Sequence, residues 1–217
     1  AAMRLLATMA PDTASMSMVL AVIAGGSILL GNLGALTQTD IRRMMAYSGV
    51  AHTGYLLLGA VTLTTSGYIA AVFYAVAYAF PSLGVMLVTA EEGPALADLN
   101  GLSSRRPAAA WATAVMLLSL IGIPPLVGFF GKLFLFQAAL SGGQTVLVVL
   151  AVTMSVVSAG YYLRIVRAMF FAEEEPGHRG AALNRPAAVA LTMCIIAVVG
   201  IGLFAGPLFQ AMGTFLR

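Results

Sequence analysis

The stretch SLIGIPPLVGFFGKLFLF, residues 119–136, decides how the rest of the sequence is interpreted. It is apolar enough to lie in a membrane, yet it contains one lysine, Lys132, and the proline pair Pro124 and Pro125. Each proline lacks a backbone N–H donor, so a helix through this stretch must bend or break near Gly122, before the lysine. A lysine in hydrocarbon costs roughly 2.5–3.5 kcal/mol on insertion scales, so it normally lines a polar path or meets a partner.

Composition puts the whole chain in the class of membrane proteins. Of its 217 residues, 60% are apolar and only 9% are charged, and the mean hydropathy is +0.97. A helix that crosses a bilayer needs about 20 mainly apolar residues, and the sequence divides into about six such stretches. We therefore predict an all-α, polytopic transmembrane bundle of about six spanning helices, one of them broken at Gly122–Pro125.

Short polar connections separate the predicted helices. The helices cover about 15–36, 44–63, 68–89, 108–140, 144–171 and 186–212. The fourth would be roughly 50 Å long at about 1.5 Å per residue, against about 30 Å of hydrocarbon, so a break or an overhang is expected there. Residues 1–14 are interpreted as the tail of a preceding helix and a loop, so we expect the sequence to be part of a longer chain.

Arginines indicate the orientation of the chain in the membrane. One set of connections contains Arg42, Arg43, Arg105, Arg106, Arg164, Arg167, Arg179 and Arg185. The other set has Arg217 and, if it reaches that surface, Arg4. Cytoplasmic loops carry an excess of lysine and arginine, so we expect the first set, with the loop at 172–185, to be cytoplasmic and the C-terminus to lie outside. The net charge of +3 then needs no nucleic-acid partner.

Proton handling is the chemistry that these residues offer. The sequence has no phosphate-binding loop, no cysteine or histidine metal cluster and no haem-binding histidine pair. Burial disfavours the charged form of a lysine, so Lys132 can lose and regain a proton, as a relay requires. Every carboxylate falls in a connection or at a helix end, so we expect Lys132 to meet water, a tyrosine or serine hydroxyl, or a carboxylate of another chain. The alternative is a lysine that snorkels to the membrane surface.

His52 is the second candidate for proton translocation. Ser48, His52 and Tyr55 lie at i, i+4 and i+7 of one predicted helix and share a face. A neutral imidazole can both accept and donate a proton, although a structural histidine bonded to a neighbouring helix is an equal alternative. The remaining candidates for channel lining, four residues apart on the next helix, are Tyr74, Tyr78 and Ser82. Aromatic stripes of this kind also arise from packing alone.

Three stretches resemble a known family. They are GNLGALTQTDIRRMMAYSGVAHTGYLLLGA at 31–60, GIPPLVGFFGKLFLFQAAL at 122–140 and YYLRIVRAMFF at 161–171. In this order they are similar to the antiporter-like membrane subunits of respiratory complex I, and the third is most similar to the subunit N branch. The resemblance implies that residues 15–171 form the second of two inverted five-helix repeats and that 186–217 form the last helix. It also implies that Lys132 belongs to the proton route toward the outer side.

The resemblance implies a function as well. The chain is expected to carry half of a proton channel in a membrane subunit of a bacterial NADH-quinone oxidoreductase of the inner membrane. No cofactor is expected on this chain; FMN, iron–sulfur clusters and quinone would belong to other subunits. The implied partners are other membrane subunits, neighbouring antiporter-like subunits and the lipid bilayer. The alternatives are a subunit of a multi-subunit cation/proton antiporter, which shares the same motifs, and a structural spacer with an idle lysine.

Overall fold

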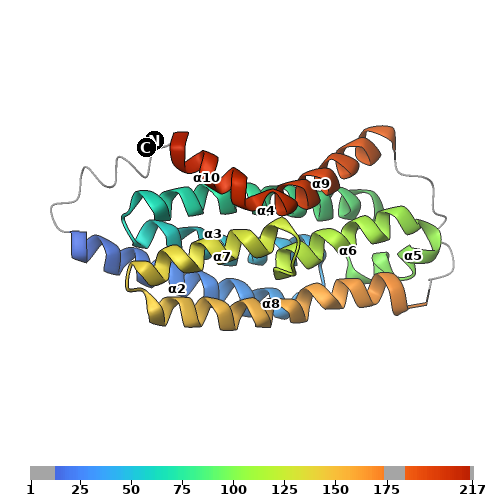
Figure 1. Cartoon of the computed structure of the whole chain (residues 1–217). Coiled ribbons are helices and arrows are strands. Elements are labelled where there is room, and N and C mark those ends of the chain that lie inside the picture. The colour runs from blue at the N-terminus through green and yellow to red at the C-terminus, as the bar shows by residue number, and fades with distance from the viewer. Residues whose placement is uncertain (1–12, 174–183, 216–217) are drawn as a thin grey trace.

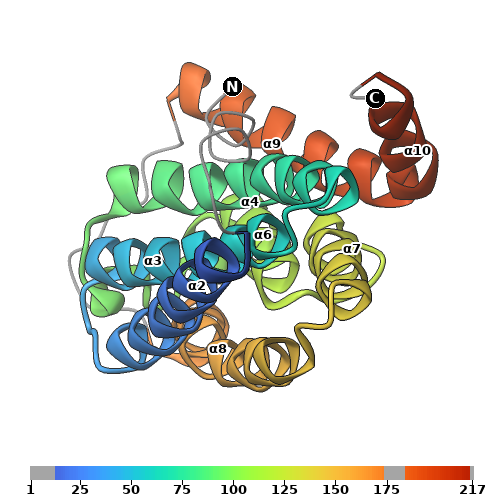
Figure 2. The same ribbon diagram turned by 90° about the vertical axis from the view of Figure 1, so that its left-hand side faces the viewer.

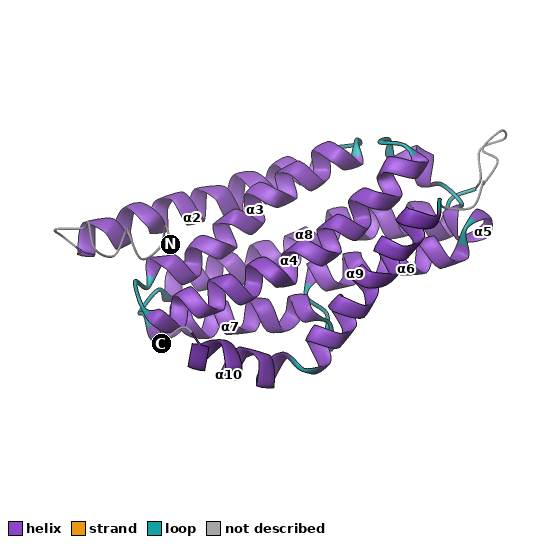
Figure 3. Cartoon of the chain, turned by 90° about the horizontal axis from the view of Figure 1, so that it is seen from above, coloured by secondary structure: helices purple, strands orange, loops and turns teal. Residues whose placement is uncertain are grey.

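The chain folds into helices. The computed structural model describes residues 13–173 and 184–215, and no strand occurs among them (Figure 3). The elements are α2 (Thr13–Leu36), α3 (Ile41–Val61), α4 (Thr65–Glu92), the 3-10 helix η1 (Leu96–Leu99), α5 (Leu102–Arg105), α6 (Pro107–Ile121), α7 (Val127–Ser141), α8 (Thr145–Phe171), α9 (Arg185–Leu203) and α10 (Ala205–Phe215). The all-α class is confirmed. Residues 1–12, most of the stretch expected to be the tail of a preceding helix and a loop, lie outside the described residues.

The long helices run side by side along one axis of the bundle (Figure 1). α2 packs against α3 and α8, and α3 packs against α4. α6 and α7 lie end to end and both contact α4 and α8, so the pair occupies the place of one longer helix. α9 covers α4, α6 and α7 on one face, as the end-on view shows (Figure 2). This arrangement puts the α6–α7 connection inside the bundle's length rather than at an end.

Length and composition single out α2, α4, α8 and α9 as membrane spans among the described helices. α6 and α7 are apolar but have 15 residues each, roughly 22 Å against about 30 Å of hydrocarbon, so neither crosses alone. α3 was also predicted to span, but it is not one of the four; it carries Arg42, Arg43 and His52. The described part of the chain is thus a multi-pass membrane bundle with four candidate spans and two shorter apolar helices.

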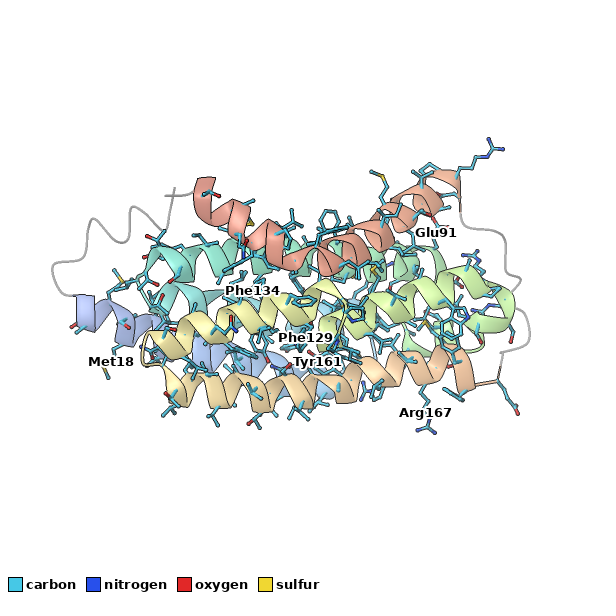
Figure 4. The ribbon with its side chains drawn as sticks, in the orientation of Figure 1. Met18, Glu91, Phe129, Phe134, Tyr161 and Arg167 are labelled. Carbon is cyan, nitrogen blue, oxygen red and sulfur yellow. The ribbon has the colours of Figure 1, made fainter. Side chains whose placement is uncertain are left out.

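Apolar side chains cover the outside of the bundle. Val146 is 86% exposed and Val156 72% exposed, both on α8, and Met18 projects from the free end of α2 (Figure 4). A soluble protein would rarely leave so many large apolar groups in water, so this surface suits lipid or other membrane subunits.

The described arginines gather at one end of the bundle. Glu92 at the end of α4 pairs with Arg105 at 3.3 Å and with Arg106 at 2.7 Å, and Arg105 also donates to the backbone carbonyl of Asp98 at 3.0 Å. Arg164 donates to the carbonyls of Leu36 and Gln38, and Arg167 points away from α8 at the same end. The first contacts join α4 to η1 and α5, and Arg164 joins α8 to the end of α2; the Gly101 N–H donates to the Ala168 carbonyl at 3.2 Å and links the two groups into one cap. Arg4, Arg179 and Arg217 lie outside the described residues.

The last predicted helix differs from the structure. The sequence predicted one helix over 186–212, but α9 ends at Leu203 and α10 begins at Ala205, and the two meet at an angle. Phe204 leaves the helical path with φ −106° and ψ 20°. Pro207 in the first turn of α10 has no N–H to donate to the carbonyl four residues before it, which weakens a continuous helix here.

Candidate functional site

The chain is interrupted between α6 and α7. α6 ends at Ile121 and α7 begins at Val127. Gly122 adopts a left-handed conformation with φ +98°, which only glycine takes at little cost. Two prolines follow, which cannot donate the hydrogen bonds that would continue α6. The last carbonyls of α6 are therefore left without partners from their own helix.

Lys132 uses those carbonyls. It lies on α7, its side chain is buried, and its Nζ donates to the carbonyls of Leu120 and Ile121, each at 2.9 Å. The third donation goes to Ser155 Oγ on α8 at 2.7 Å. Because the carbonyl end of a helix carries partial negative charge, α6 stabilises the ammonium group without a carboxylate. No described carboxylate forms an ion pair with Lys132.

Gly122 also makes room for this lysine. A Cβ at residue 122 would lie 3.3 Å from Lys132 Cδ and 3.6 Å from Nζ. A side chain there would both strain the backbone and press on the lysine. The glycine therefore sets the turn and the position of the amine together.

A cavity adjoins the lysine between α7 and α8. Its volume is about 420 Å³, and Lys132, Ser155, Phe129, Phe136 and Val152 are among its lining residues. Lys132 and Ser155 are the lining residues with polar side chains, and the rest of the wall is apolar. The amine thus lies beside a recess whose wall is apolar apart from Lys132 and Ser155.

His52 is the centre of a second polar cluster. Its Nδ1 lies 2.8 Å from the hydroxyl of Tyr74, and its Nε2 lies 3.3 Å from the hydroxyl of Tyr162. The Tyr162 hydroxyl also hydrogen-bonds Ser48 at 2.5 Å, and the ring of Tyr78 stacks on the imidazole with centroids 4.2 Å apart. Both nitrogens therefore have a hydroxyl partner, so a proton can enter at one nitrogen and leave from the other.

Tyr55 lies between the two groups. The Lys132 Nζ is 5.4 Å from the centroid of the Tyr55 ring, and the Tyr55 and His52 rings meet edge to face at 5.7 Å. The Tyr55 hydroxyl donates to the carbonyl of Ala151 at 3.1 Å, one turn before Ser155 on α8. The amine and the imidazole are thus parts of one buried polar region in the middle of the bundle.

The structure brings together most of the predicted residues. Ser48, Tyr55, Tyr74 and Tyr78 all lie at or beside His52. Ser82 lies beside the Tyr78 side chain, and its hydroxyl donates to the carbonyls of Tyr78 and Ala79 on its own helix, at 2.8 and 3.0 Å. The three residues predicted on one face of α4 are therefore neighbours, with Tyr74 and Tyr78 in contact with His52 and Ser82 in contact with Tyr78.

Three parts of the site were not predicted. They are the α6 carbonyls, Ser155, and the α8 tyrosines, of which Tyr161 donates to Asn32 on α2 at 3.2 Å. The sequence does carry a signal for the two tyrosines: Tyr161 and Tyr162 lie together inside an apolar helix, where each buried hydroxyl requires a hydrogen-bond partner. Figure 4 labels Tyr161 and Phe129 near the middle of the bundle, where α7 and α8 face each other.

Metal binding has no support among the residues that the structure describes. No group of three or more histidine, cysteine, aspartate or glutamate side chains there could hold an ion. Cys194 is buried and free on α9. His178 lies outside the described residues.

Comparison with known proteins gives a consistent set of relatives. The family model described as "NADH:quinone oxidoreductase/Mrp antiporter, TM" matches residues 1–158. The chain is 40% identical over 209 residues to NADH-quinone oxidoreductase subunit N 2 of Symbiobacterium thermophilum. That alignment covers 93% of this chain and 41% of the relative, so the chain spans about two fifths of its length.

Two solved structures share the fold. A chain of respiratory complex I from Thermus thermophilus with bound aureothin superposes with a TM-score of 0.81 at 33% identity, over 90% of this chain and 45% of that one. A chain of the Mrp complex from Dietzia sp. superposes with a TM-score of 0.82 at 25% identity, over 92% of this chain and 46% of that one. Both similar chains are members of multi-subunit complexes.

Proposed function

Because the chain belongs to the NADH:quinone oxidoreductase/Mrp antiporter transmembrane family, we propose that it is part of a proton-translocating subunit of an NADH-quinone oxidoreductase. The subunit would correspond to subunit N, as in the relative from Symbiobacterium thermophilum. In this proposal residues 15–171 and the last helix carry half of a proton channel. FMN, iron–sulfur clusters and quinone belong to other subunits of the complex and drive the transfer.

The observation that carries the proposal is the setting of Lys132. Its amine is buried, adjoins a cavity and is held by two helix-end carbonyls and one hydroxyl. Carbonyl and hydroxyl dipoles stabilise an ammonium group less strongly than a carboxylate partner would, so Lys132 can still lose its proton. A lysine that is held in position and can still release its proton is what a relay requires.

The His52 cluster supplies a second step of the same path. The imidazole accepts a proton at one nitrogen and releases one from the other toward Tyr74 or Tyr162. The Tyr55 ring separates the imidazole from Lys132, and the Tyr55 hydroxyl donates its hydrogen bond to the Ala151 carbonyl on α8. In this proposal, water between His52 and Lys132 carries the proton from one group to the other, and Lys132 is the group nearer to the outer side of the membrane.

The proposal extends to location and partners. The subunit is assigned to the bacterial inner membrane, where it contacts lipid and neighbouring antiporter-like subunits. The cap of arginines at the ends of α2, α4 and α8 faces the cytoplasm, because basic residues concentrate on that side, and the C-terminus lies outside. The exposed apolar surface of α8 is available for lipid or for a neighbouring subunit.

A second candidate is a subunit of a multi-subunit cation/proton antiporter. The similarity to a chain of the Dietzia Mrp complex favours it, since that fold match is as extensive as the one to complex I. In this case the same lysine would exchange protons against a cation gradient, with no redox partner.

Purification of the full-length protein from its native membrane separates these two functions. We expect it to co-elute with proteins that carry flavin and iron–sulfur absorbance, and we expect the preparation to reduce a quinone with NADH. If the protein instead purifies without those chromophores and catalyses sodium-driven proton exchange in vesicles, the antiporter assignment replaces the first.

Replacement of His52 with glutamine tests the second step of the path. The amide retains hydrogen-bonding capacity but cannot take up a proton, so we expect proton pumping by the assembled complex to fall roughly tenfold or more. Pumping is measured by quenching of a pH-sensitive dye in vesicles. Thr53→Val is the matched control, because the neighbouring hydroxyl is exposed and donates only to Gly49 of the same helix. Equal pumping by His52→Gln and Thr53→Val would mean that His52 is structural.

A further inference from the structure

Ser155 differs from the other two partners of Lys132. The carbonyls of Leu120 and Ile121 can only accept hydrogen bonds, whereas the Ser155 hydroxyl can accept or donate. Ser155 Oγ lies 2.7 Å from Lys132 Nζ and 3.4 Å from the Ile121 carbonyl oxygen. One hydroxyl on α8 therefore touches both the amine and one of the carbonyls that hold it.

The number of donors on the lysine changes with its charge. An ammonium group has three N–H donors, which match the two carbonyls and Ser155 Oγ. A neutral amine has two N–H donors and one lone pair, so one of the three partners must become a donor. Neither carbonyl can do so. Ser155 is the one partner that can satisfy the neutral amine.

Rotation about one bond is enough for this change. With Lys132 charged, the Ser155 hydrogen is directed toward the Ile121 carbonyl while its oxygen accepts from Nζ. With Lys132 neutral, the same hydrogen turns to the nitrogen lone pair, and both carbonyls keep an N–H donor. No heavy atom moves. An unpaired buried donor or acceptor would otherwise destabilise one of the two charge states.

We propose that Ser155 is a positioning residue that keeps Lys132 fully hydrogen-bonded in both charge states by reversing the direction of their hydrogen bond. The proposal rests on the proton-transfer role given to Lys132 above. When an N–H bond of the ammonium breaks, the proton passes to water in the adjoining cavity and the electron pair stays on Nζ, where Ser155 donates to it. Reprotonation from water reverses both changes.

Other groups near Lys132 do not supply this donor. Among the helices that pack against α7, α3 contributes Tyr55 and His52, and α4 contributes Tyr74. The Tyr55 hydroxyl lies beside Ser155 but donates its one hydrogen to the Ala151 carbonyl, and Tyr74 is bonded to His52. α6, α8 and α9 present no described carboxylate, histidine, lysine or arginine to the amine.

Threonine and valine at residue 155 provide the test, because they have the same shape and differ in the hydroxyl. In the full-length protein within its complex, we expect Ser155→Thr to keep proton pumping within about twofold of wild type. Ser155→Val should lose roughly tenfold, the effect of one hydrogen bond to a charged group. Ser158→Ala is the control, since that buried hydroxyl one turn away donates to the Ser155 carbonyl and makes no hydrogen bond to Lys132, and it should pump like wild type. The amount of assembled complex is measured for each variant.

If the Ser155→Val variant pumped protons at the same rate as the Ser155→Thr variant, the proposal would be overturned. If both bulkier variants fail, Ser155→Ala decides: a roughly tenfold loss supports the hydroxyl's role, and wild-type pumping overturns it. If Ser155→Ala is silent while replacement of Lys132 abolishes pumping, only the role of Ser155 is wrong. If replacement of Lys132 is silent too, the proposed function of the site is wrong.

Discussion

Replacement of Lys132 with alanine in the full-length protein of the assembled complex is expected to reduce proton pumping to below about a tenth of wild type. The coupled quinone reductase rate should fall with it. The alanine removes the one amine at the helix interruption and leaves the carbonyls of Leu120 and Ile121 in an apolar pocket. Dye quenching in vesicles measures pumping, and NADH oxidation with added quinone measures electron transfer.

Two further variants show what the lysine contributes. Lys132→Arg keeps the positive charge but cannot release a proton, because guanidinium stays protonated in proteins. We expect it to pump as poorly as the alanine variant. Gln137→Ala removes an exposed polar group from the same helix and should match wild type. A fully active Lys132→Arg would mean that the site needs a charge and not a proton, and a fully active Lys132→Ala would leave a structural spacer as the remaining interpretation.

The proline pair predicted an interruption, and a serine hydroxyl was among the expected partners of Lys132, but the two helix-end carbonyls were not expected. Pro124 and Pro125 lack backbone donors, but Pro81 lies inside the uninterrupted α4, so the signal here is the proline pair together with Gly122, whose φ is positive. Which atoms lie beside Lys132 depends on how the chain turns at Gly122 and Leu126. Backbone carbonyls carry no signature in a sequence, because every residue has one.

Contacts within one helix were predicted better than contacts between helices. The i, i+4 and i+7 spacing put Ser48, His52 and Tyr55 on one face of α3, and the structure keeps all three at the polar centre. Tyr162 joins this cluster from 110 residues away in the chain. Its place depends on how α8 packs against α3, which helical periodicity does not determine.

Membrane-spanning helices were predicted correctly where a long apolar run of residues defines them. α2, α4 and α8 agree with the predicted helices because long apolar runs have few other stable conformations in a membrane. The division of the last helix at Phe204 was missed, although Pro207 lies in the interior of the predicted helix 186–212, where it lacks a backbone donor.

The second large effect is expected from Gly128→Ala, at the second residue of α7. A Cβ there would lie 1.9 Å from the Ser119 carbonyl oxygen and 2.8 Å from its carbonyl carbon. These are backbone atoms of α6 that cannot rotate away, so the start of α7 must move. The Gly128 N–H would then lose its hydrogen bond to Ser119 Oγ, now 3.2 Å long. We expect a destabilisation of about 3 kcal/mol, at the upper end of the usual cost of overpacking.

The displacement should also reach the lysine, because Lys132 lies four residues after Gly128 on the same helix. Moving α7 away from α6 lengthens the contacts from Nζ to the carbonyls of Leu120 and Ile121. We therefore expect Gly128→Ala to lower both the thermal midpoint of the purified complex and its pumping per assembled complex. Gly26→Ala is the matched control, since a Cβ at that helical glycine meets no atom within 4 Å. If the two variants were equally stable and pumped equally well, close packing at the interruption would not be what holds the amine in position.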